Sequence, residues 1–123
     1  MIWLGVVLAG GVGAVLRFLV DRAVARRAAR SLPFVGLPFG TLAVNISGAA
    51  LLGLLGGLAL SRHTALLAGT AFVGSYTTFS TWMLETQRLS EERKDRNAVA
   101  NIVVSIVLGI GAALFGQWIA GRI

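Results

Sequence analysis

The chain has 123 residues, of which 56% are hydrophobic and only 13% are charged, and its mean hydropathy of +0.81 is too high for a soluble domain of this length. Cysteine is absent, which excludes disulfides, thiol catalysis and thiolate metal sites. The single His63 falls in a predicted loop, so zinc and haem chemistry are not expected. The composition predicts a membrane protein, and no catalytic constellation indicates an enzyme.

Four bilayer-spanning helices would nearly exhaust the chain. A spanning helix needs about 20 mostly apolar residues, and the apolar stretches fall at residues 2–20, 39–60, 65–84 and 97–120. The connections between them are too short to hold a soluble domain. We therefore predict an all-α membrane protein, with residues 1–123 forming a single domain of four transmembrane helices.

The first predicted helix carries an arginine. Gly10, Gly13 and Arg17 are spaced at i, i+3 and i+7, so they share one face, and the glycines would let another backbone approach closely. Arg17 lies near the helix end, where it either anchors the helix at the headgroups or holds the fold together and attracts an anion. The basic residues 21–30 either extend the helix or lie along the membrane surface.

Two prolines after the basic segment, Pro33 and Pro38, are expected to stop the helix.

The second predicted helix has an amide within its apolar sequence. Thr41, Asn45 and Gly48 share one face at i, i+4 and i+7. An asparagine in hydrocarbon needs partners, so Asn45 either bonds to a neighbouring helix or faces an ion as a donor. Gly53 and Gly57 form a Gly-x-x-x-Gly spacing, which favours a close helix crossing, although glycine is common in membrane helices generally.

The third predicted helix ends in an unusually polar stretch, residues 74–85, which carries six hydroxyl side chains and two further aromatics. Hydroxyl-bearing and β-branched residues after a glycine can interrupt a membrane helix and turn carbonyls and hydroxyls inward. Broken helices commonly hold ions. Alternatively, the hydroxyls bond to carbonyls of the preceding turn and the aromatics lie at the interface. We predict a break at the centre of this helix, with an ion site beside it.

The fourth predicted helix carries a polar or small residue every four positions, at Asn97, Asn101, Ser105 and Gly109. Such residues lie along one face of a helix. The stripe serves either helix packing or a polar track for an ion.

The basic residues indicate how the chain inserts. With four spans, both termini share a side with the second connection, and that side holds Arg62 and Arg122. The opposite side holds eight basic residues: Arg22, Arg26, Arg27, Arg30, Arg88, Arg93, Lys94 and Arg96. The positive-inside rule then predicts one orientation, with both termini outside. The net charge of +6 fits contact with anionic lipids, and no nucleic-acid motif accompanies the basic residues.

Three motifs in this order resemble the Fluc (CrcB) fluoride channel family. They are Gly-Gly-Val-Gly-Ala-Val-Leu-Arg at residues 10–17, Gly-Thr-Leu-Ala-Val-Asn-Ile-Ser-Gly at 40–48, and Gly-Ser-Tyr-Thr-Thr-Phe-Ser-Thr-Trp at 74–82. The resemblance covers all four predicted helices. It implies a fluoride-specific channel in the cell membrane that passes F⁻ passively and lowers cytoplasmic fluoride. It also implies an antiparallel dimer of two four-helix subunits, with two pores and a structural Na⁺ at the symmetry axis.

The resemblance also assigns roles to residues. The backbone carbonyls of Gly74 and Thr77 would hold Na⁺ jointly with the partner subunit. Arg17 matches the family's first-helix arginine, and Glu85 corresponds to an acidic residue near the pore mouth. The residues implied in the fluoride pathway are Asn45, Phe79, Ser80, Thr81, Trp82 and Ser105.

The sequence departs from the family pattern at three positions. Trp82 replaces a residue that is usually Phe, and Ser75 and Tyr76 replace a commoner glycine-containing pair. Many members have a weak charge bias and form homodimers. The strong bias here favours pairing with an oppositely oriented homologous subunit, with a homodimer as the alternative.

Two other functions remain open at this point. A small multidrug exporter has a similar length, but proton-coupled export needs a carboxylate within a span, and Asp21 and Glu85 lie at helix ends. A membrane assembly factor would explain the faces of small residues but not the polar stretch.

Overall fold

The computed structural model describes residues 2–31 and 36–123, and within them the regular structure is entirely helical, as predicted. The longest helices are α1 (Ile2–Ser31), α2 (Phe39–Gly57) and α6 (Asp95–Ala120). Between α2 and α6 the chain forms α3 (Arg62–Ala65), the π-helix η1 (Leu66–Val73), α4 (Gly74–Tyr76) and α5 (Ser80–Glu91). In the described chain, α1, α2 and α6 are each long and apolar enough to cross a membrane.

The first helix does not end with its apolar sequence. α1 continues without interruption through the basic residues 21–30, so this segment extends the helix. Pro38 directly precedes α2, and its carbonyl accepts the first hydrogen bond of that helix from the Leu42 N–H at 3.1 Å. Pro33 lies outside the described residues.

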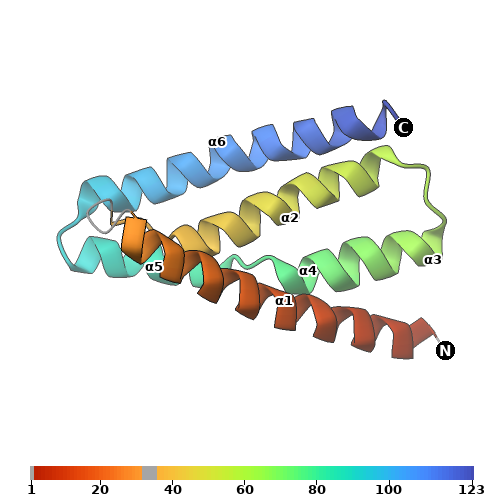
Figure 1. Ribbon diagram of the computed structural model, residues 1–123, viewed down its shortest axis with the longest axis horizontal. Coiled ribbons are helices and arrows are strands. Elements are labelled where there is room, and N and C mark those ends of the chain that lie inside the picture. Colours follow the sequence, from red (N-terminus) through yellow and green to blue (C-terminus); the bar gives the residue numbers. More distant parts are fainter. Residues whose placement is uncertain (1, 32–35) are drawn as a thin grey trace.

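The helices α2 and α6 lie side by side along most of their length (Figure 1). A Cβ added to Gly53 on α2 would overlap the carbonyl of Ala113 on α6, and one added to Gly116 on α6 would overlap the carbonyl of Ala50. The two backbones therefore touch where both helices lack side chains. The glycine spacing in the second predicted helix thus marks a close crossing.

The helix α1 packs against η1 and α4. A Cβ on Gly13 would overlap the carbonyl of Phe72, and one on Gly10 would lie 3.2 Å from Ser75 Oγ. These glycines bring α1 against the segment that leads into the polar stretch, which is the close approach that their shared face predicted.

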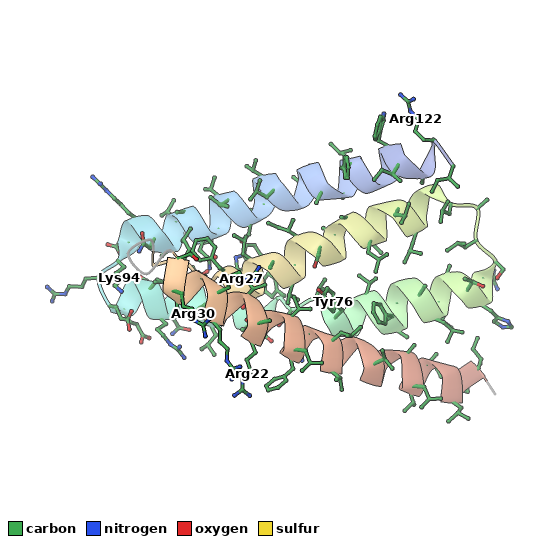
Figure 2. All side chains as sticks on the ribbon, in the orientation of Figure 1. Arg22, Arg27, Arg30, Tyr76, Lys94 and Arg122 are labelled. Carbon is green, nitrogen blue, oxygen red and sulfur yellow. The ribbon has the colours of Figure 1, made fainter. Side chains whose placement is uncertain are left out.

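The two ends of the molecule differ in charge. The termini lie at the same end as the connection between α2 and α3, whereas the connection between α5 and α6 lies at the other end (Figure 1). Arg22, Arg27, Arg30 and Lys94 lie toward the end that holds the connection between α5 and α6 (Figure 2). Arg122 lies at the end that holds the termini (Figure 2). The folded chain keeps the separation of basic residues on which the topology prediction depends.

Large apolar side chains cover much of the outside. On α1, Val7 is 70% exposed, and on α6, Val107 is 61% exposed. Such a surface is stable only in apolar surroundings, either lipid or another apolar protein face. This agrees with a multi-pass membrane protein.

Candidate ion pathway at the helix interruption

The polar stretch contains a short non-helical segment. α4 ends at Tyr76 and α5 begins at Ser80, and residues 77–79 between them are not helical. Thr77 has an extended backbone, with ψ of 164°, and its hydroxyl donates to the Val73 carbonyl at 3.0 Å. The Thr78 hydroxyl accepts the Thr81 N–H at 3.2 Å and so satisfies one of the free backbone donors in the first turn of α5. Local side-chain bonds thus replace the helical pattern at this point.

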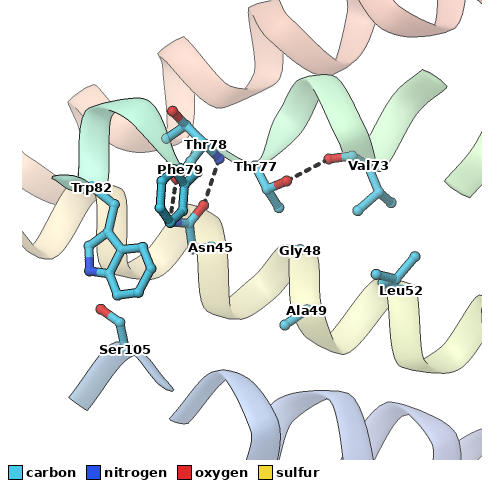
Figure 3. Close-up of a pocket in the computed structure, with 10 residues that line it drawn as sticks. All are labelled: Asn45, Gly48, Ala49, Leu52, Val73, Thr77, Thr78, Phe79, Trp82 and Ser105. Atoms are coloured by element: carbon cyan, nitrogen blue, oxygen red, sulfur yellow. Dashed lines mark hydrogen bonds between the residues drawn. The ribbon is translucent and has the colours of Figure 1, made fainter. Parts of the chain in front are cut away.

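Asn45 on α2 braces the non-helical segment. Its Nδ2 donates to the Thr78 carbonyl at 2.8 Å, and its Oδ1 accepts the Thr78 N–H at 2.8 Å (Figure 3). The side chain therefore satisfies both backbone groups of one residue, and Asn45 bonds to the non-helical segment rather than to a neighbouring helix. Because the amide has two N–H donors and this pair uses one, the other is left for a further partner.

A groove runs beside this brace. It is lined from α2, η1, the non-helical segment, α5 and α6, by Asn45, Gly48, Ala49, Leu52, Val73, Thr77, Thr78, Phe79, Trp82 and Ser105 (Figure 3). Most of this lining is apolar, and a few polar groups interrupt it. Such a lining suits a small solute that needs a few well-placed partners.

Two aromatic rings flank the groove. Phe79 and Trp82 pack edge to face, with centroids 5.7 Å apart and an interplanar angle of 80°. Phe79 is 69% exposed, whereas Trp82 is partly buried. Ring edges carry partial positive charge, so they attract electron-rich atoms.

Trp82 is tied to α6 by a network that the residue spacing alone did not predict. Its Nε1 donates to the Asn101 carbonyl at 3.3 Å, and Asn101 Nδ2 donates to Thr86 Oγ1 at 2.9 Å. The Thr86 hydroxyl donates in turn to the Trp82 carbonyl at 2.9 Å. In the sequence, the one indication of this network is that Asn101 belongs to the polar stripe of the fourth predicted helix.

The other residues implied in the pathway occupy different places. Ser105 lines the groove from α6, and its hydroxyl is buried without a hydrogen-bond partner within residues 2–31 and 36–123. Ser80 is exposed, with its Oγ 3.5 Å from Thr78 Oγ1. Thr81 lines a second, smaller cavity, together with Arg17 and Asp21. The structure thus brings Asn45 and Ser105 to the groove with both aromatics, and places Ser80 and Thr81 outside it.

The structure places Arg17 midway along α1 and Glu85 midway along α5, so neither residue lies at a helix end as the sequence predicted. Arg17 belongs to the second cavity, which Thr41 and Thr78 also line. Glu85 lines a neighbouring hollow with Asp21 and Gly40. Thr78 lines both the groove and the second cavity, so these two spaces share one wall.

The two residues that depart from the family pattern before the break have defined neighbours. The Tyr76 hydroxyl lies 2.9 Å from Ser47 Oγ, which links α4 to α2, and Tyr76 stacks on Phe72. Ser75 lies beside Gly10 on α1. Both side chains therefore pack between helices and away from the groove lining.

The carbonyls of Gly74 and Thr77 lose the partners that a regular helix would provide. A continued helix would direct the Thr78 N–H to the Gly74 carbonyl, but this N–H bonds to Asn45. Likewise, the Thr81 N–H would meet the Thr77 carbonyl, but it bonds to Thr78 Oγ1. Hard cations such as Na⁺ bind oxygen ligands of this kind. Within the described chain, no cluster of three or more acidic or histidine side chains offers a metal site instead.

Taken together, these features define a small multi-pass membrane protein with a short non-helical segment beside a mostly apolar groove. Residues 4–117 match the family model described as CrcB-like protein, Camphor Resistance (CrcB). The chain belongs to this family.

Similar proteins cover nearly the whole chain. A protein of Mycolicibacterium paratuberculosis named fluoride-specific ion channel FluC 2 is 73% identical over 97% of this chain and 93% of its own length. A protein of the same name from Mycobacterium tuberculosis is 70% identical over 97% of this chain and 90% of its own. Fluoride-specific ion channel FluC 1 of Streptomyces avermitilis is 43% identical over 98% of this chain and 96% of its own.

Proposed function

We propose that this chain is one subunit of a fluoride-specific ion channel, which passes F⁻ passively across the cell membrane and so lowers cytoplasmic fluoride. The observation that carries the proposal is the groove, where Asn45, Ser105, Phe79 and Trp82 meet beside the non-helical segment that Asn45 braces. The names of relatives up to 73% identical support the same ion.

The donors suit fluoride because it is small and strongly hydrated. A pore must replace its water with hydrogen-bond donors, yet must not hold the ion so tightly that it cannot leave. The second N–H of Asn45, the hydroxyl of Ser105 and the edges of Phe79 and Trp82 provide partial positive charge without a full cation. Passive conduction needs no general base.

The residues outside the groove then mark the approach to it. Ser80 and Thr81 lie at the start of α5, Arg17 lines the second cavity, and Glu85 lines the neighbouring hollow. In this proposal fluoride enters or leaves past these side chains, where Arg17, midway along α1, offers a positive charge beside the groove rather than in its lining.

A second four-helix subunit in the opposite orientation completes the channel. One subunit leaves Phe79 69% exposed beside the groove, and a partner subunit would cover this open side. The eight-to-two distribution of basic residues favours one orientation for this chain, with both termini outside and the basic end in contact with anionic lipids. We therefore favour a homologous partner of opposite orientation over a homodimer.

A structural Na⁺ at the centre of this dimer fits the carbonyls of Gly74 and Thr77. These carbonyls lack their helical amide partners, and two subunits related by a central axis would each contribute the same pair. When bound, Na⁺ offsets the negative potential of the carbonyls and joins the subunits.

Fluoride efflux from liposomes tests the proposal. The complex is purified from its native membrane through a tag on this chain and is reconstituted with and without Na⁺. Sodium-dependent fluoride efflux is expected. Exchange of a drug for protons would indicate a small multidrug exporter, and absence of any flux would indicate an assembly factor. The purified single chain is measured alongside, and sodium-dependent conduction by it alone would contradict an obligate heterodimer.

A further inference from the structure

The hydrogen bond from Trp82 to α6 has a consequence for Ser105. The indole N–H donates to the carbonyl of Asn101 at 3.3 Å, and Asn101 is only 3% exposed. Asn101 is itself fixed by its bond to Thr86, which bonds back to Trp82. This closed set of bonds keeps the indole on one carbonyl of α6.

That carbonyl is the one that Ser105 would normally use. A serine inside a membrane helix commonly donates its hydroxyl proton to the carbonyl four residues earlier, which here is Asn101. The same carbonyl also serves the backbone N–H of Ser105 within α6. Because a carbonyl oxygen has two lone pairs, the backbone N–H and the indole N–H fill it.

The Ser105 hydroxyl is therefore left without the acceptor on α6 that it would normally use. It is buried and has no partner in the described part of the chain, and it borders the groove (Figure 3). A buried hydroxyl without a hydrogen-bond partner is unfavourable, so the arrangement suits a group in the groove that can accept a hydrogen bond from it.

We propose that Trp82 is a positioning residue for Ser105: its indole N–H occupies the Asn101 carbonyl and thereby keeps the Ser105 hydroxyl free to donate to an anion in the groove. The inference rests on the proposed fluoride pathway. It gives the tryptophan a role that depends on its N–H, which a phenylalanine lacks.

A double-mutant cycle tests the coupling. Trp82→Phe keeps an aromatic ring but removes the N–H, and Ser105→Ala removes the hydroxyl. Because one hydrogen bond to the ion is at stake, each change is expected to slow fluoride efflux by about tenfold, and the double variant by no more than either single one. Efflux at the unmodified rate in Trp82→Phe, or effects that multiply to about a hundredfold in the double variant, would overturn the proposal. Trp118→Phe, at an exposed indole near the other end of α6, is the matched control and should conduct normally.

A second measurement is independent of flux. The chain has no cysteine, so Ser105→Cys introduces a unique S–H group whose infrared stretching band reports its hydrogen bonding. The band should shift to lower frequency when Trp82→Phe is added, because the thiol can then donate to the Asn101 carbonyl. An unchanged band would overturn the positioning role whatever the flux. A shifted band in a complex that never conducts fluoride would support the positioning of Ser105 and contradict the proposed channel.

Discussion

Removal of the Asn45 side chain tests how the helix interruption is held. Asn45→Ala deletes the two hydrogen bonds of 2.8 Å that join α2 to both backbone groups of Thr78. Interhelical hydrogen bonds in membrane proteins contribute about 0.6 kcal/mol each on average and up to about 1.7 kcal/mol. The pair lies beside a partly buried backbone, which no longer finds a partner in the variant. We therefore expect a loss of about 1–3 kcal/mol in the free energy of unfolding.

The same substitution should affect transport more strongly than stability. Without the brace, residues 77–79 can move, and Phe79 belongs to this segment. The variant also loses the free N–H of the amide, and one hydrogen bond to the ion corresponds to about tenfold in rate. We expect fluoride efflux to fall at least tenfold, with a lower thermal midpoint in detergent.

Gln117→Ala, which removes an exposed amide from α6, is the matched control and should change neither property. An Asn45→Ala protein with unmodified stability would refute the brace. Normal fluoride efflux in a destabilised variant would refute the role of Asn45 as a donor in the pathway.

Three further predictions concern packing, the aromatic ring and the cation. Gly53→Ala should destabilise the protein by about 1–3 kcal/mol, because the added Cβ would meet the Ala113 carbonyl. Gly56→Ala is the control, since the space around Gly56 is open, and it should be tolerated. Equal thermal midpoints for the two variants would contradict the close crossing. Phe79→Ile should abolish fluoride efflux while the complex still assembles, as judged by size-exclusion chromatography, and a variant that conducts normally would remove this ring from the pathway. Replacement of Na⁺ by a large organic cation during reconstitution should also abolish efflux, and unchanged efflux would argue against a sodium ion at the two carbonyls beside the break.

The sequence was most informative where an apolar surrounding made a polar or small residue costly. An amide in hydrocarbon must find partners, so Asn45 could be expected to bond to another part of the chain, and it bonds to Thr78 in the non-helical segment. Gly53 and Gly13 could be expected to mark close approaches, because a small residue lets the backbones of two membrane helices come close together. The all-helical membrane fold followed from the lengths of the apolar stretches.

Other features depend on contacts that spacing does not contain. The bond between Trp82 and Asn101 joins residues on two helices whose relative rotation is set by packing. Thr81 lies outside the groove, and its backbone N–H bonds to the Thr78 hydroxyl, a contact that the spacing of residues does not reveal. Residues 66–73 form a π-helix, yet their apolar composition is equally suited to an α-helix.

The most direct test of the central claim compares fluoride with chloride. The complex purified from its native membrane is reconstituted into liposomes that are loaded with potassium fluoride and potassium chloride. The liposomes are diluted into an ion-free osmolyte with a potassium ionophore present to balance charge, and each anion is followed with its own electrode. The account predicts rapid loss of fluoride with chloride retained. Equal loss of both anions, or retention of both, would contradict it.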